Sequence, residues 1–173
     1  MTKCIIRMAS GESMTLELFP EAAPLTVANF ADLANRGFYD GLGFCRIVEG
    51  YVIQGGSVDD QIMTDSDFHL FGEFAENGMD TGLRHVRGAI SMARDEGMNT
   101  AGTQFFIVHR DAPKLDGRYA AFGILREGFD VLDRIAQTPT EGAEAWNRPL
   151  SMPVMQSVRV SSDTPLPPVQ RLP

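Results

Sequence analysis

The sequence predicts one all-β domain, in which short strands form a sheet closed into a barrel and two helices cover its ends. The chain has 173 residues, of which 43% are apolar and 22% charged, enough for one independent core. Strand-like segments outnumber helical ones and are separated by glycines. Because the strands do not alternate with helices, a parallel doubly wound sheet is disfavoured.

The first two predicted strands, residues 3–8 and 14–18, have the pattern of a hairpin. In the second of them, Met14, Leu16 and Leu18 alternate with polar residues and therefore share one face. The residues between the two strands are rich in serine and glycine, which is usual for a turn. This pattern predicts a strand with one apolar face.

Two segments have the spacing of helices. Residues 24–37 begin with Pro24, which suits a first helical turn, and end at Gly37, which suits a helix terminus. The apolar stripe of this helix consists of Val27, Phe30, Ala31 and Ala34. In residues 128–137 one face carries Phe129, Leu132, Asp133 and Ala136. One acidic residue therefore interrupts the apolar face of the second helix.

Six further strands complete the predicted sheet. They fall at residues 43–48, 51–54, 88–93, 103–109, 119–125 and 153–160. We assign residues 1–160 to one domain and residues 161–173 to a proline-rich tail without an apolar pattern. Such a tail is usually extended and solvated. Because the tail contains several X–Pro bonds, it could also lie in the groove of a neighbouring molecule, or it could pack on its own barrel.

The charge of the chain argues against some partners. With 15 Lys and Arg against 23 Asp and Glu, the formal net charge is -8, whereas nucleic acids and anionic membranes are bound through clustered basic residues. The chain contains no run of about 18 apolar residues, so it predicts no membrane span. The N-terminal apolar stretch is too short for a secretory signal. We expect a cytoplasmic protein that binds neither nucleic acid nor membrane, and we expect a monomer.

The cysteines and histidines do not predict a metal site. Cys4 and Cys45 are too few for a disulfide framework and are interpreted as buried apolar residues in a reducing compartment. His69, His85 and His109 lie far apart, without the spacing of zinc ligands. The sequence therefore predicts neither a metal nor another cofactor.

Arg46 is a basic residue in a segment that otherwise reads as buried. With a period of two, it shares a face with Phe44 and Val48. One interpretation is a charge at the rim of the barrel, paired with an acid such as Glu49 or Glu73. The other is a charge that takes part in chemistry. The spacing alone favours the first.

A second strand segment also mixes polar and apolar side chains on one face. Gln104, Phe106 and Val108 point the same way, which predicts a lining that can hold apolar groups and bind backbone amides. The neighbouring residues 97–104 lack the Gly-Lys-Ser/Thr ending of a phosphate-binding loop. These observations do not decide the function.

Five longer motifs resemble a known family, the cyclophilins, which are peptidyl-prolyl cis-trans isomerases. The motifs are FCRIVEGYVIQGG (44–56), RGAISMAR (87–94), NTAGTQFFI (99–107), LDGRYAAFG (115–123) and GFDVLDRIA (128–136). The resemblance extends over about residues 3–160 and is to the bacterial single-domain type. It implies a closed eight-stranded antiparallel barrel capped by two α-helices. It also implies rotation about X–Pro bonds, a reaction that needs no cofactor and no metal.

The same resemblance implies roles for ten residues. The residues with an implied catalytic role are Arg46, Gln54 and Phe106. Those with an implied substrate-binding role are Tyr51, Val52, Ala93, Arg94, Gln104, Leu115 and Tyr119. Arg46 matches the donor to the prolyl nitrogen in the twisted transition state. The implied partners are proline-containing peptides and unfolded or partly folded proteins.

The chain also departs from the usual pattern of the family. Tyr119 stands where many members have histidine, and Lys114 stands where a tryptophan helps many members to bind cyclosporin. The only tryptophan, Trp146, lies well outside that motif, so we expect weak cyclosporin binding. A module that holds proline-containing segments with little turnover is the alternative function.

Overall fold

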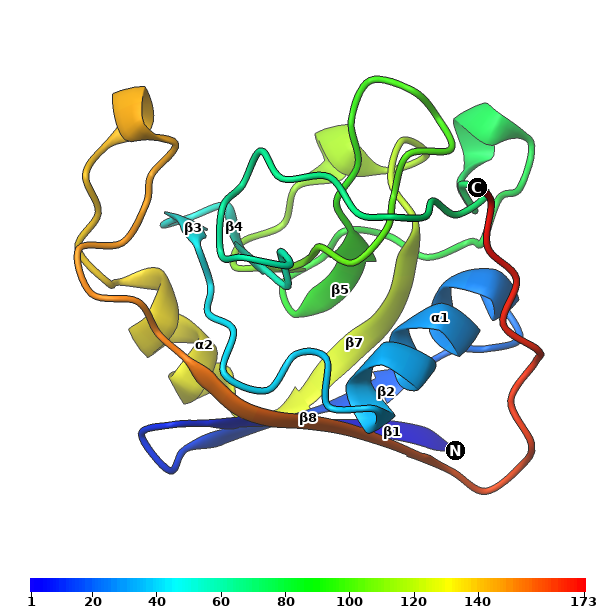
Figure 1. Ribbon diagram of the computed structural model, residues 1–173, viewed down its shortest axis with the longest axis horizontal. Coiled ribbons are helices and arrows are strands. Elements are labelled where there is room, and N and C mark those ends of the chain that lie inside the picture. The colour runs from blue at the N-terminus through cyan, green and yellow to red at the C-terminus, as the bar shows by residue number, and fades with distance from the viewer.

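The computed structural model describes all residues from Met1 to Pro173. Its strands are β1 (Thr2–Met8), β2 (Ser13–Leu18), β3 (Arg46–Val48), β4 (Val52–Gly55), β5 (Ala89–Met92), β6 (Phe105–Val108), β7 (Ala121–Glu127) and β8 (Met155–Ser162), and its α-helices are α1 (Pro24–Asn35) and α2 (Phe129–Ala136). The strands form one antiparallel sheet in the order β3-β4-β6-β5-β7-β2-β1-β8 (Figure 1). All eight predicted strands and both predicted helices are therefore confirmed.

The sheet is not closed, and the prediction of a closed barrel is wrong. The strands turn through 202° as an open half-barrel, with β3 and β8 at its two edges. The loop between α2 and β8 covers the β3 edge, because the Ile47 N–H donates to the Asn147 carbonyl over 3.1 Å. The chain before β3 meets the start of β8 through the isolated bridge of Gly43 and Val154 and through backbone hydrogen bonds between residues 41–44 and residues 153–155. The loop, and not β8, therefore provides a hydrogen-bond partner for the backbone at the edge of β3.

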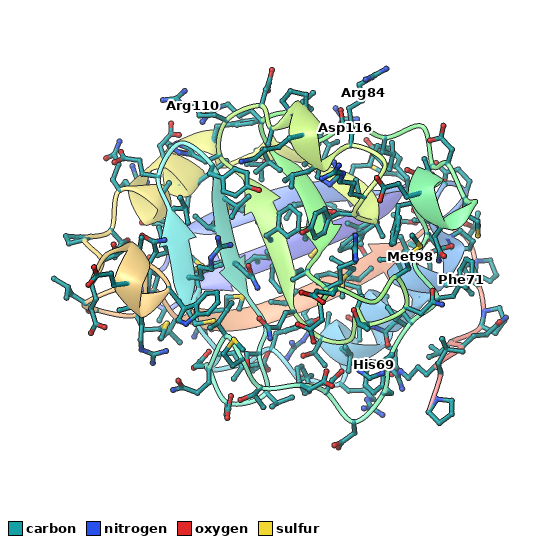
Figure 2. All side chains as sticks on the ribbon, turned by 90° about the horizontal axis from the view of Figure 1, so that it is seen from above. His69, Phe71, Arg84, Met98, Arg110 and Asp116 are labelled. Atoms are coloured by element: carbon teal, nitrogen blue, oxygen red, sulfur yellow. The ribbon has the colours of Figure 1, made fainter.

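The main core lies between the curved sheet and α1. Phe30 of α1 is fully buried, with its ring centroid 5.3 Å from Tyr39, 5.4 Å from Phe105 and 5.2 Å from Phe122. Burying each of these rings contributes on the order of 1.5–3 kcal/mol. Figure 1 shows α2 on the opposite side of the molecule from α1, and Figure 2 shows β3 to β6 lying over β1, β2 and β8. No helix has the length and hydropathy needed to cross a membrane.

The alternation predicted for residues 43–48 is wrong at Phe44. Phe44 is fully buried in the main core, 6.1 Å from Phe105 between ring centroids, whereas Arg46 lines a surface cavity. β3 begins only at Arg46, and the chain before it is irregular. A period of two holds only along regular strand, so it does not relate Phe44 to Arg46.

Both cysteines are buried and unbonded, as the sequence predicts. Burial raises the pKa of the Cys45 thiol to about 11, so the thiol stays protonated at neutral pH. Cys4 belongs to the main core. Both residues therefore act as small apolar side chains.

The C-terminal tail lies on its own molecule. Leu172 and His69 exchange two backbone hydrogen bonds of 3.0 and 2.8 Å. The Arg171 guanidinium donates to Asn29 over 2.7 Å and to Asp32 over 2.8 Å, both on α1. Figure 1 shows the tail passing α1 on its way to the C-terminus, and Figure 2 labels His69. No residue of the tail lines the cavity around Arg46.

Candidate active site

A cavity of about 280 Å³ opens beside β3, β4 and β6. Nine of the ten residues singled out in the sequence line it, and Gln104 lines a smaller adjoining hollow of about 70 Å³. Four further lining residues were not predicted, namely Ile62, Met63, Asp95 and Trp146. The fold thus gathers the predicted residues from distant parts of the chain into one place.

Strand register places the three predicted catalytic residues side by side. Arg46 of β3 is directly opposite Gln54 of β4, and Gln54 is directly opposite Phe106 of β6. Directly opposed residues on adjacent strands project from the same face of the sheet. All three side chains therefore reach the cavity together.

The side chain of Arg46, a half-buried residue, makes only one hydrogen bond within the protein. Its Nη1 donates to Oε1 of Gln54 over 3.2 Å, and it forms no ion pair within 4.0 Å. The pairing with Glu49 or Glu73 is therefore wrong. Glu73 instead accepts hydrogen bonds from Thr26 at the start of α1, where its charge suits the helix N-terminus. The remaining N–H groups of Arg46 are free for a ligand.

Gln54 is held between Arg46 and Gln104. Its Nε2 donates to Oε1 of Gln104 over 3.0 Å. Gln104 in turn donates to the carbonyls of Ile62 and Thr64 over 3.2 and 3.3 Å. Because each amide both donates and accepts, the orientation of Gln54 is fixed with its oxygen toward Arg46.

The cavity contains an apolar cup, which consists of Val52, Phe106 and Leu115. These side chains are 2, 4 and 6% exposed and form a second hydrophobic cluster separate from the main core. The Tyr119 ring stands edge-on to Phe106 with centroids 5.7 Å apart. Together these groups offer a small concave surface that suits a five-membered ring.

A buried polar group supports Phe106 from behind. His85 stacks on the Phe106 ring at 5.9 Å, and its two ring nitrogens lie 3.0 Å from Oδ1 of Asp116 and 2.9 Å from Oγ of Ser91. Burial lowers the pKa of His85 despite the hydrogen bond with Asp116, which is labelled in Figure 2. Ser91 is fully buried, so this group fixes the cup and cannot reach a substrate. Sequence reasoning missed it, although Ser91 is a polar residue in an apolar strand.

Comparison with known protein families identifies the family of this chain. The model described as cyclophilin type peptidyl-prolyl cis-trans isomerase/CLD matches residues 4–160. The chain belongs to the cyclophilin family. Its activity is peptidyl-prolyl cis-trans isomerisation.

Relatives and solved structures agree with this assignment. The chain is 43% identical to peptidyl-prolyl cis-trans isomerase B of Bacillus subtilis over 71% of this chain and 82% of the relative. It is 36% identical to peptidyl-prolyl cis-trans isomerase A of Dickeya dadantii over 90% of this chain and 83% of the relative. A cyclophilin of Cryptosporidium parvum, crystallised in the presence of the dipeptide Ala-Pro, superposes with a TM-score of 0.82 at 27% identity, covering 93 and 99% of the two chains.

In this cyclophilin, Arg94 shapes one wall of the cavity. Its guanidinium donates to the carbonyls of Asp95, Glu96 and Arg118 and lies 5.0 Å over the Tyr119 ring. These contacts occupy the Arg94 guanidinium with partners inside the protein. Arg94 therefore orders its own loop and steadies Tyr119.

The wall around Tyr51 is held through Asp133 of α2, which the sequence wrongly placed on the apolar face: the buried face is Val131, Leu132, Ile135 and Ala136, and the Asp133 side chain is 37% exposed. Arg87 donates two hydrogen bonds to its carboxylate, which lowers the pKa of Asp133 to about 2. The same carboxylate lies 2.9 Å from Nε2 of His109, whose Nδ1 accepts the Gly50 N–H over 2.8 Å. This arrangement fixes the chain directly before Tyr51.

The departures from the family pattern also lie at the cavity. The Lys114 ammonium stands 4.5 Å over the Tyr51 ring, beside the cup. Trp146 is far from the other motifs in sequence, but the loop between α2 and β8 brings it to the cavity. Trp146 therefore belongs to the wall of the cavity, and Lys114 stands beside that wall.

Proposed function

We propose that Arg46 accelerates X–Pro isomerisation by donating a hydrogen bond to the prolyl nitrogen in the twisted transition state. The uncatalysed barrier is about 18–20 kcal/mol, because rotation destroys the conjugation of the peptide bond. The nitrogen then regains a lone pair, which a fixed donor binds better than it binds either planar isomer. The observation that carries this proposal is an Arg46 side chain beside the apolar cup that has no ion pair and only one hydrogen bond, to Gln54. A pure binding module has no use for such a donor.

The other predicted residues take supporting roles in this proposal. The cup receives the proline ring, with Tyr51 and Tyr119 at its sides. Gln54 orients Arg46 and meets the substrate backbone, and Gln104 fixes Gln54. The Ala93 N–H donates to the Gln104 carbonyl over 3.1 Å, while the carbonyl of Ala93, a partly buried residue, accepts no hydrogen bond from the protein. That carbonyl is free to pair with a backbone N–H of the peptide.

The decisive experiment is the cis-trans interconversion of a proline tetrapeptide. We expect Arg46→Ala to lower kcat/KM at least tenfold, which is about 1.4 kcal/mol of barrier. Arg46→Lys keeps the charge and loses the rigid fork, so an intermediate rate is expected. Arg36→Ala, at an exposed arginine away from the cavity, serves as the matched control. Equal rates for the wild type and Arg46→Ala would contradict the mechanism.

The proposed substrates are proline-containing peptides and unfolded or partly folded proteins, so the enzyme assists protein folding. We propose that it acts as a monomer in the cytoplasm, and the net charge of -8 and the two free thiols support this. The folding role is tested by adding the enzyme to a protein whose slow refolding phase is limited by proline. Cell fractionation and size-exclusion chromatography test the location and the oligomeric state.

A further inference from the structure

We propose that Met63 and Trp146 form an apolar rim that selects prolines with a large apolar residue next to them. This inference rests on the proposed function and names the substrate class of the same site. The two side chains are 71 and 55% exposed. Ten large apolar side chains of the molecule are exposed, and only these two line the cavity. Exposed apolar groups that gather at a cavity indicate a binding surface.

Trp146 is fixed in place by its loop. Trp146 and Asn147 have φ values of 58° and 54°, a left-handed conformation that asparagine adopts readily but that is costly for tryptophan. The Asn147 carbonyl accepts the Ile47 N–H of β3, and the next residue, Arg148, donates to the Asp60 carbonyl over 2.8 Å. These bonds hold the strained turn and keep Trp146 beside β3, the strand of Arg46.

Met63 is presented by a second loop. The carbonyls immediately before and after it, those of Ile62 and Thr64, both accept hydrogen bonds from the side chain of Gln104. Gln104 is also bonded to Gln54. The same amides that orient Arg46 therefore also fix the backbone on both sides of Met63.

The rim is continuous with the cup, because the same cavity contains both. A peptide in extended form advances about 3.3 Å per residue, so a residue adjacent to the bound proline lies within reach of the rim. The flat indole and the flexible thioether both favour large apolar or aromatic side chains. The proposed occupant is therefore a large apolar side chain of the substrate peptide, next to its proline.

Two peptide series test this proposal, one with phenylalanine or leucine next to proline and one with glycine or glutamate there. We expect Trp146→Ala and Met63→Ala to lower kcat/KM about tenfold on the apolar series, through KM, and to leave the other series unchanged. Trp146→Phe keeps an apolar ring and restores most of the selectivity. Leu150→Ala is the control for the Trp146 loop, because Leu150 is 67% exposed and does not line the cavity. Met79→Ala is the corresponding methionine control.

Trp146 also provides a direct measurement, because it is the only tryptophan. Its fluorescence is expected to shift when apolar-flanked peptides bind and to stay unchanged with glycine-flanked peptides. Equal losses on both series, or unchanged selectivity in the two variants, would overturn the rim while the Arg46 mechanism stands. A wild type without activity on either series would instead remove the proposed function itself.

Discussion

The Arg46 guanidinium donates one hydrogen bond of 3.2 Å to the Gln54 amide oxygen, directly across the β3–β4 pair. The amide orients the donor without neutralising its charge, as a carboxylate would. An arginine with free N–H groups next to an apolar cup is therefore available to a prolyl nitrogen.

Replacing Gln54 by glutamate is expected to impair the enzyme more than replacing it by leucine. Gln54→Glu creates an ion pair that competes with the substrate for Arg46, and we expect kcat to fall at least tenfold. Gln54→Leu removes the hydrogen bonds with Arg46 and Gln104, and loss of the one that orients Arg46, worth about 1 kcal/mol, predicts a rate lower by about fivefold. Tetrapeptide kinetics measure both. A Gln54→Glu variant as active as the leucine variant would contradict the proposed role of a free guanidinium.

The stability of the protein is expected to fall as the pH drops below about 6.5, the usual pKa of histidine. Burial lowers the pKa of His85 in the folded state, so the unfolded chain takes up a proton at a higher pH than the folded chain does. The stabilisation by neutral His85 is therefore present above pH 6.5 and is lost as the pH falls toward the folded pKa. Urea unfolding at pH 7.5 and 5.5 measures this loss. It should be smaller in His85→Gln, and an equal loss in both proteins would show that other groups cause it.

Removing the Arg171 side chain is expected to destabilise the fold although it lies in the tail. Asn29 is fully buried, accepts from Arg171 and donates to the Gly102 carbonyl over 3.1 Å. Arg171→Ala leaves the Asn29 oxygen without its partner, at a cost of about 1–3 kcal/mol. Urea unfolding measures the change, with Arg110→Ala as the control, because Arg110 is exposed and away from Asn29 and Asp32. A loss no larger than that of the control would mean that the tail adds little to the stability.

Cyclosporin is expected to bind weakly. Lys114 occupies the position of the usual tryptophan and lies over Tyr51, while Trp146 approaches from another loop. We expect Lys114→Trp to raise the affinity at least tenfold. Calorimetric titration measures both proteins. Tight, stoichiometric binding by the wild type would contradict this expectation.

The helices, the strands and most of the residues around Arg46 can be predicted from the sequence. Alternation along β2, the apolar stripe of α1 and the glycines between strands depend on neighbouring residues, so they can be read locally. The long motifs identified the family and ten residues, all of which line the cavity or the hollow beside it.

The tertiary structure alone decided how these elements meet. The sheet stays open because the Asn147 loop covers the edge of β3, Phe44 turns into the core before the strand begins, and Trp146 reaches the cavity. The support of Phe106 by His85 likewise joins distant segments. Each of these contacts depends on how distant segments pack, and no period of two or 3.6 residues reports such packing.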